Sequence, residues 1–127
     1  MGKSSGDYFS WRYSSCDLNP VVGTEQAGVR PVVILQIDRA NAVSPHTIIV
    51  PFTTKIRRPL LPSHVFVPAG VGGLSRDSVL LCEQIRVIDK RRIVKVLGRL
   101  DEPYLEKIDR ALHAILGLET GHDPYTF

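Results

Sequence analysis

Residues 31–36 read PVVILQ, an unbroken apolar run rich in β-branched side chains, with a proline at its entrance. A run of this kind is typical of a strand that is buried on both faces. We therefore expect it to form the central strand of a sheet. A second apolar run, HTIIVPF at 46–52, predicts another strand, and its Pro51 indicates a sheet edge or a bulge because proline has no N–H for the ladder. Thr53 and Thr54 follow at the C-terminal lip of that strand.

Further short runs predict the rest of the sheet. They are HVFVP at 64–68, DSVLLCEQ at 77–84 and IRVID at 85–89, separated by turns that contain Pro62, Gly70, Gly72 and Gly73. About five short strands, separated by turns and carrying bulge signals, indicate a small β-barrel.

The end of the chain predicts a helix that covers one end of this barrel. Apolar residues recur there at three- and four-residue spacing and form one stripe: Leu105, Ile108, Leu112, Ile115 and Leu116. Asp101 can cap the start of the helix, Pro103 falls in its first turn, and Gly117 lies near its end. The predicted fold class is mainly β with a C-terminal α-helix.

The length of 127 residues predicts a single domain, 1–127. Residues 1–16 have the pattern of an irregular lead-in or a poorly patterned first strand, and residues 119–127 that of a frayed tail. DLNPVVGTEQAGV at 17–29 predicts a long polar loop, because proline and glycine interrupt any strand alternation. Loops of this length in a compact domain are usually functional or mobile.

The net charge of +3 is mild, but the basic residues are concentrated in two places. One group is Lys55, Arg57 and Arg58, and the other is Arg86, Lys90, Arg91, Arg92, Lys95 and Arg99. Such groups attract nucleic acid or an acidic protein segment. The alternative is a solvated surface without a partner, since charged runs are common on protein surfaces.

The cysteines and the N-terminus bear on location. Cys16 and Cys82 are too few for a disulfide framework, which predicts reduced thiols and a cytoplasmic protein. The N-terminus lacks the apolar core of a signal peptide, and no apolar run approaches the roughly 20 residues that span a bilayer. We expect no membrane contact, and we expect Cys82 to lie in the core because free cysteines are most often buried.

The sequence carries no recognisable metal or cofactor motif. The four histidines, His46, His64, His113 and His122, lack the close spacing and the acidic neighbours of a metal site. The turn at Gly70–Gly73 is not followed by the Lys-Ser/Thr start of a phosphate-binding helix, and no serine occupies a nucleophile elbow. We therefore expect no metal and no cofactor.

A set of polar side chains at the strand edges remains for chemistry: Glu25, Gln26, Arg30, Ser44, Thr53, Glu83, Gln84 and Arg86. Arg30 stands out because a guanidinium beside a buried strand needs a partner, either a carboxylate within the fold or a phosphate from outside. Thr53 alone is most simply a strand-end hydroxyl bonded to backbone. The residue types leave both choices open.

Five stretches of the chain match one family in the right order. They are DLNPVVGTEQAGVRPVVILQ (17–36), the segment from Asn41 through Ser-Pro to PFTTKI (41–56), LPSHV (61–65), LSRDSVLLCEQIRVIDKRRI (74–93) and LGRLDEPYLEKIDRALHAILGL (97–118). In these stretches the chain resembles the MazF/PemK-type toxins of bacterial toxin–antitoxin systems. Together they cover most of the chain, so the resemblance is far more specific than any single motif.

The resemblance implies a small SH3-like β-barrel of the CcdB/PemK type, usually a homodimer, that cleaves single-stranded RNA at short sequence motifs without a metal ion. It implies catalytic roles for Arg30 and Thr53, which would grip the phosphate while the RNA 2′-hydroxyl attacks it. It implies that RNA is bound by Thr24, Glu25 and Gln26 in the long loop and, on the substrate face, by Ser44, Glu83, Gln84 and Arg86. The implied partner is a cognate antitoxin whose acidic, disordered tail occupies the RNA groove.

The chain departs from the family pattern at its N-terminus. WRYSSC directly precedes Asp17, and the Gly6-Asp7 pair comes too early for an ungapped match, so we expect an insertion or a degraded first strand. Two other classes of protein stay open. One is a CcdB-like topoisomerase poison with the same barrel and no nuclease activity, and the other is an interaction module whose basic segments hold an acidic partner.

Overall fold

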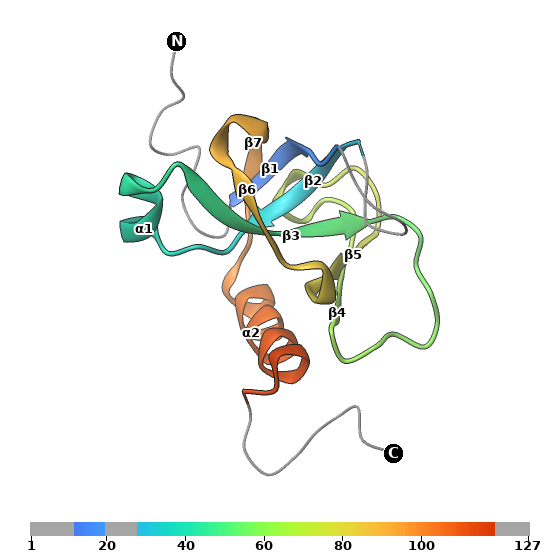
Figure 1. The fold of residues 1–127 in the computed structure, drawn as a ribbon. Coiled ribbons are helices and arrows are strands. Elements are labelled where there is room, and N and C mark those ends of the chain that lie inside the picture. Colours follow the sequence, from blue (N-terminus) through green and yellow to red (C-terminus); the bar gives the residue numbers. More distant parts are fainter. Residues whose placement is uncertain (1–11, 20–27, 119–127) are drawn as a thin grey trace.

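The computed structural model describes residues 12–19 and 28–118, which form one antiparallel sheet of seven strands and a C-terminal helix (Figure 1). The strands are β1 (Arg12–Asp17), β2 (Val29–Ile34), β3 (His46–Thr53), β4 (His64–Val67), β5 (Ser78–Leu81), β6 (Arg86–Asp89) and β7 (Ile93–Arg99). The helices are α1 (Asp38–Val43) and α2 (Glu102–Leu116), with three short 3₁₀ turns, η2 (Val71–Gly73), η3 (Cys82–Gln84) and η4 (Lys90–Arg92). The predicted fold class, mainly β with a C-terminal α-helix, is confirmed.

The prediction that residues 31–36 form the central strand is confirmed. The strand order is β4-β5-β3-β2-β1-β7, with β6 pairing to β3, so β2 has a partner on each side. Val32, Val33 and Ile34 are fully buried. Successive side chains of a strand point to opposite faces of its sheet, so this β-branched run can fill two cores at once.

Pro51 does not mark a sheet edge, because β3 is also an interior strand. β3 pairs with β6 from His46 to Ile49 and with β5 at Phe52 and Thr53. The Ile48 carbonyl accepts a hydrogen bond from the Leu35 amide near β2, so the alternation of a strand turns the nitrogen of Pro51 toward the other side. On that side β3 passes from β6 to β5, and the missing N–H costs no ladder bond.

Several predicted elements have different bounds, and two were not predicted. The run at 77–84 stops being a strand at Leu81, and its last three residues form η3. β7 was not predicted because most of its side chains are exposed and several are basic, which is typical of an edge strand but carries no apolar alternation. α1 is only six residues long, too short to show helical periodicity.

The sheet curls like a barrel, but its hydrogen-bonded path stays open. β4 and β7 are the terminal strands of the order, and within the described part of the chain no ladder joins them. Instead η2, which follows β4, contacts β7 and bridges the gap. The predicted barrel is therefore not closed by strand pairing, and contact between η2 and β7 joins the two ends of the sheet instead.

Two apolar clusters lie on the two faces of the sheet. The larger cluster, called core 1, contains Val33, Val50, Phe52, Val65, Val67, Leu74, Leu80, Cys82, Leu100, Ile108 and Ala111. The smaller cluster, called core 2, contains Cys16, Leu18, Val32, Ile34, Ile49, Ile88 and Ile93. The expectation that Cys82 is a core residue is confirmed. Cys16 is equally buried, so the end of the predicted lead-in is a proper strand, β1, with apolar contacts.

Helix α2 covers core 1, as predicted, and lies below the curled sheet in Figure 1. Ile108 and Ala111 are its buried residues, while Leu116 from the predicted stripe is 51% exposed. Asp101 occupies the N-cap position without making a side-chain hydrogen bond, so its predicted capping bond is absent. Gly117 ends the helix with a φ of 67°, the left-handed conformation that favours glycine.

Candidate active site

The two predicted catalytic residues lie on neighbouring strands, Arg30 in β2 and Thr53 in β3. The β2–β3 ladder pairs Val32 with Pro51 and Ile34 with Ile49, and it ends at Val32 and Pro51, where β3 goes on to pair with β5. Arg30 and Thr53 each lie two residues beyond that last pair, so strand alternation turns each to the same face as its neighbour in the pair. Residues opposite each other in an antiparallel pair point to the same face of the sheet. Arg30 and Thr53 therefore share the face that carries core 2.

Each member of this pair is also held from its outer side. Arg30 is paired with Cys16 of β1, and Thr53 is paired with Val79 of β5. Arg30 is half-buried, and Thr53 is buried. Because both backbones belong to paired strands, the two side chains start from rigid positions, which is what a catalytic constellation requires.

Thr53 is buried, and its hydroxyl accepts a hydrogen bond from the backbone. The residue is 6% exposed, and its Oγ1 accepts a hydrogen bond from the Lys55 amide at 3.1 Å. The structural interpretation of Thr53 as a strand-end hydroxyl bonded to backbone is thus confirmed. A hydroxyl has one hydrogen to donate besides its lone pairs, so this bond leaves the Thr53 O–H able to reach a phosphate oxygen.

Glu83 is occupied within the protein. Its carboxylate accepts hydrogen bonds from Ser63 Oγ at 3.1 Å and from His64 Nε2 at 3.0 Å. His64 Nδ1 accepts the Leu61 amide at 3.3 Å, so the proton of the neutral ring resides on Nε2 and points at Glu83. Both oxygens of Glu83 therefore tie η3 to the start of β4. Gln84 is the next residue of η3 and is half-buried.

Arg86 lies on the same face as Arg30 and Thr53. It is paired with Ile49 of β3, a core 2 residue, and its Nη1 donates to the Leu18 carbonyl at 3.5 Å. Ser44 is not near this group. It follows α1 at the opposite end of β3 from Thr53, and the eight-residue strand between them spans about 23 Å. The Ser44 hydroxyl accepts the His46 amide at 3.1 Å, which is a turn contact.

The three loop residues expected to bind RNA, Thr24, Glu25 and Gln26, lie outside the described residues. Strand alternation thus turns Arg30, Thr53 and Arg86 to one face of the sheet. The structure assigns Glu83 a partner within the fold, and it places Ser44 apart.

Much of the second basic group is engaged in contacts within the fold. The Arg91 guanidinium donates to Asp89, and this hydrogen bonding lowers the pKa of the Asp89 carboxyl to about 2. Lys90 Nζ donates to the Asn41 carbonyl, and Arg92 Nη1 donates to the carbonyls of Asp17 and Asn19. These contacts favour a structural role for most of this group. Lys95 and Arg99 of β7 remain exposed.

The first basic group lies directly after Thr53. Lys55 and Arg57 are exposed, and the Arg58 guanidinium carbon is 5.7 Å from the centroid of the Phe66 ring. These cations follow Thr53 directly in the sequence and add positive charge to the segment after β3. Exposed cations next to a catalytic pair attract a polyanion over distances set by the Debye length, about 8 Å at physiological salt.

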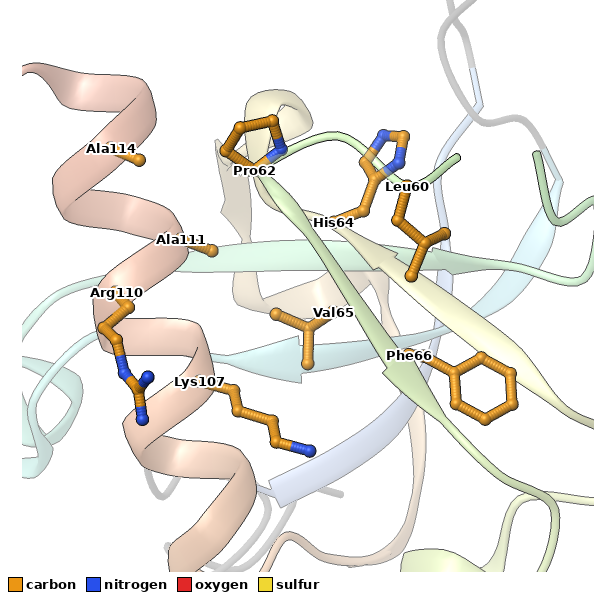
Figure 2. A pocket seen from close by; sticks show the side chains of 9 residues that line it. All are labelled: Leu60, Pro62, His64, Val65, Phe66, Lys107, Arg110, Ala111 and Ala114. Carbon is orange, nitrogen blue, oxygen red and sulfur yellow. The ribbon is translucent and has the colours of Figure 1, made fainter. Parts of the chain in front are cut away.

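A separate groove of about 460 Å³ lies between β4 and α2 (Figure 2). Its lining is Leu60, Pro62, His64, Val65, Phe66, Lys107, Arg110, Ala111 and Ala114. None of the predicted site residues lines it. In Figure 2 the groove has an apolar floor, and Lys107 and Arg110 come from the helix side. His64, whose two ring nitrogens are both hydrogen-bonded, offers the groove no free acid or base.

Metal and thiol chemistry find no support among residues 12–19 and 28–118. No group of three or more His, Cys, Asp or Glu side chains there is arranged to hold a metal ion. Burial raises the pKa of Cys82 to about 12 and that of Cys16 to about 11. Thiols with such pKa values are scarcely ionised at neutral pH, so neither can serve as a nucleophile there. None of the described helices has the length and apolar character needed to cross a bilayer.

Residue patterns give little warning of several contacts that shape this site. Ser63 and His64 meet Glu83 across some twenty residues of chain, and Arg92 reaches Asn19 across more than seventy. No local spacing encodes such contacts. In the sequence, the only indication of the Asn19–Arg92 contact is that Asn19 lies near the start of the family-like stretch 17–36 and Arg92 near the end of the stretch 74–93.

Comparison with known proteins identifies the family of this chain. Residues 14–116 match the family of PemK-like, MazF-like toxins of type II toxin–antitoxin systems. The chain belongs to this family.

Similarity to individual proteins supports this family assignment. The chain is 47% identical to the endoribonuclease EndoA of Bacillus subtilis (strain 168) over 102 residues, which are 80% of this chain and 88% of that protein. Among solved structures, MazF of Deinococcus radiodurans superposes with a TM-score of 0.73 at 26% identity, covering 86% of this chain and 96% of that one. A mycobacterial endoribonuclease in complex with its cognate antitoxin has a TM-score of 0.74 at 21% identity, covering 89% and 98%, and supports the fold.

Proposed function

We propose that this protein is the toxin of a toxin–antitoxin pair and that it cleaves single-stranded RNA. The proposal is supported by the presence of Arg30 and Thr53 near the same end of two neighbouring strands, in a chain that belongs to the MazF/PemK-like toxins. The 47% identity to an endoribonuclease over most of the chain supports the same reaction here.

Arg30 and Thr53 supply what cleavage of RNA needs from an enzyme. RNA carries its own nucleophile, the 2′-hydroxyl, so the protein has to align it with the leaving 5′-oxygen and stabilise the charge on the phosphorane. The fork of the Arg30 guanidinium can donate to two non-bridging oxygens, and the Thr53 O–H can hold one of them. The products are a 2′,3′-cyclic phosphate and a 5′-hydroxyl. This chemistry uses no metal ion.

Arg30 acts in this proposal as an electrostatic group and not as a base. The pKa of a guanidinium exceeds about 12, so its neutral form is scarcely populated. The proton of the 2′-hydroxyl is taken by water, by a backbone group or by Glu25. Arg86, on the same face, lies where a neighbouring phosphate or base would pass, and Gln84 adds an amide for reading base edges.

The proposed partners follow from the family and the charge. We propose a cytoplasmic homodimer that binds single-stranded RNA and is neutralised by a cognate antitoxin with an acidic, disordered tail. Two solved structures of related fold, MazE–MazF complexes of Deinococcus radiodurans, contain such a pair of proteins. The exposed Lys55 and Arg57 beside Thr53 offer a positive surface for either polyanion.

Incubation of the purified protein with a long, end-labelled RNA in EDTA tests the proposal. We expect discrete fragments with 2′,3′-cyclic phosphate and 5′-hydroxyl ends, and we expect Arg30→Ala to abolish them while the protein remains folded. Intact RNA with the wild-type protein, together with inhibition of a topoisomerase, would instead favour the CcdB-like poison. Arg30→Ala with substantial residual cleavage contradicts the catalytic assignment.

A further inference from the structure

The end of β1 is held by two arginines from the segment that contains β6 and η4. Arg92 Nη1 donates to the carbonyl of Asp17 at 3.3 Å and also to the carbonyl of Asn19. Between them, the carbonyl of Leu18 accepts from Arg86 Nη1 at 3.5 Å. Three successive backbone carbonyls thus meet guanidinium donors, although the arginines are about seventy residues away in sequence.

Asn19 ties the same strand end to β2. Its Oδ1 accepts the Gly28 amide at 3.1 Å, and the Leu18 amide donates to the Gly28 carbonyl at 3.0 Å. The Asn19 amide in turn donates to Asp17 Oδ1 at 3.0 Å. The β1–β2 ladder, whose last paired residues are Asp17 and Val29, is thereby extended, and its final bond is made by a side chain.

These contacts end two residues before Arg30. Gly28 has a φ of 76° and nothing within 4 Å of where a Cβ would be, so its own sterics leave many conformations open to it. Hydrogen bonds on both its amide and its carbonyl select one of them. The direction in which the chain enters β2, and hence the start of the Arg30 side chain, depends on that selection.

We infer that Asn19 and Arg92 form a latch that positions Arg30 for RNA cleavage. Arg92 fixes the backbone at 17–19, the Asn19 side chain fixes Gly28, and Gly28 leads through Val29 into the catalytic arginine. Neither residue touches the substrate, so both are positioning residues. The inference rests on the proposed ribonuclease activity.

The latch makes a specific demand on residue 92. A guanidinium has several N–H donors in a planar fork and can serve two carbonyls, whereas a lysine ammonium is a single point of charge on a flexible stem. Arg92→Lys therefore keeps the positive charge that RNA would sense and weakens the latch. Arg91→Lys is the matched control, because the adjacent Arg91 side chain is 90% exposed and bonds only to Asp89 among the contacts described here.

Residue 19 offers a complementary pair of variants. Asn19→Ala removes the acceptor for the Gly28 amide, and Asn19→Asp keeps an oxygen at that position. Misplacement of a catalytic group by about 1 Å can cost a factor of about 100 in rate. We expect Arg92→Lys and Asn19→Ala each to lower kcat at least about tenfold with little change in KM, and we expect Asn19→Asp to restore most of kcat.

The experiment is single- and multiple-turnover cleavage of one defined RNA by the wild-type protein and these four variants, with hydrogen exchange of the Gly28 amide measured in parallel. Support requires lower kcat in Arg92→Lys and Asn19→Ala, faster Gly28 exchange in Asn19→Ala, rescue by Asn19→Asp and a normal Arg91→Lys. The double variant Arg92→Lys/Asn19→Ala is measured as well. If its kcat is no lower than that of the slower single variant, Asn19 and Arg92 act through one shared set of contacts.

The latch is overturned by parental kcat in both variants, by equal losses in Arg91→Lys, or by a raised KM with unchanged kcat, which would make Arg92 an RNA contact. Failure of the proposed function is seen separately. In that case the wild-type protein leaves the RNA intact before any variant is compared, and the latch loses the reaction that it positions.

Discussion

Gly98 of β7 lies against the backbone of Gly72 in η2, so closely that a Cβ on Gly98 would be 1.9 Å from the Gly72 carbonyl oxygen. Gly73 is similarly close to β7, with its Cβ position 3.0 Å from the Leu97 carbonyl oxygen. These glycines let η2 cross the open side of the sheet between β4 and β7. The curl of the sheet, and with it the shape of both cores, depends on this approach of two backbones.

Gly98→Ala should destabilise the protein, because the methyl group can fit only if η2 moves away from β7. We expect a loss of about 3 kcal/mol in the free energy of unfolding. Urea denaturation followed by circular dichroism measures it. The control is Gly117→Ala, where nothing lies within 4 Å and only the left-handed φ of 67° is strained, at a cost of about 1 kcal/mol. Equal losses in the two variants would show that the contact with Gly72 is unimportant.

Thr53→Val should reduce kcat for RNA cleavage by about a hundredfold, because it removes the proposed donor to a phosphate oxygen and keeps the shape of the side chain. Thr53→Ser, which keeps the hydroxyl, should retain most of the activity. The Lys55 amide loses its acceptor in the valine variant, at about 1 kcal/mol of stability. The measurement is kcat for both variants at a temperature where both are fully folded. A fully active Thr53→Val variant contradicts the proposed role of Thr53.

Glu83→Gln tests whether Glu83 serves the fold or the substrate. The amide oxygen can accept from His64 Nε2 and its NH₂ can donate to the Ser63 hydroxyl, but both hydrogen bonds lose the negative charge of the carboxylate. We expect a loss of about 1–3 kcal/mol in stability by chemical denaturation. RNA affinity under folded conditions should change little. A variant of unchanged stability with weakened RNA binding would show that Glu83 binds RNA.

Both cysteines should resist alkylation in the native protein. Burial raises the pKa of Cys16 to about 11 and of Cys82 to about 12, from an ordinary value of 9.0. Iodoacetamide at pH 8, with mass spectrometry, should label them slowly until urea unfolds the chain. Because the folded state holds these protons more tightly than the unfolded state, the two thiols contribute to stability. Their contribution is fully present below pH 9 and is lost as pH rises through 11 and 12. Rapid native labelling of either thiol would show that its surroundings open readily.

Local residue patterns were sufficient to predict the elements in which the apolar residues of the pattern are also the buried residues. In PVVILQ the residues from Pro31 to Leu35 are apolar, and their strand contributes to both cores. The stripe along α2 predicted the helix that covers core 1. β7 and α1 escaped prediction because one is an exposed edge strand with basic residues and the other is six residues long. Leu116 belongs to the stripe in sequence but lies beyond the last contact with the sheet and is exposed.

The class of fold, the buried strand at the site and the candidates Arg30 and Thr53 could be predicted from the amino-acid sequence, because apolar periodicity and family motifs are properties of contiguous residues. Which polar groups meet was set by the fold. Strand pairing put Arg30 and Thr53 near the same end of β2 and β3, Glu83 met His64, Arg92 met Asn19, and Ser44 came at the other end of β3. The physical reason is that each hydrogen bond needs both partners within about 3 Å, and pairs this far apart in sequence are set by strand order and register.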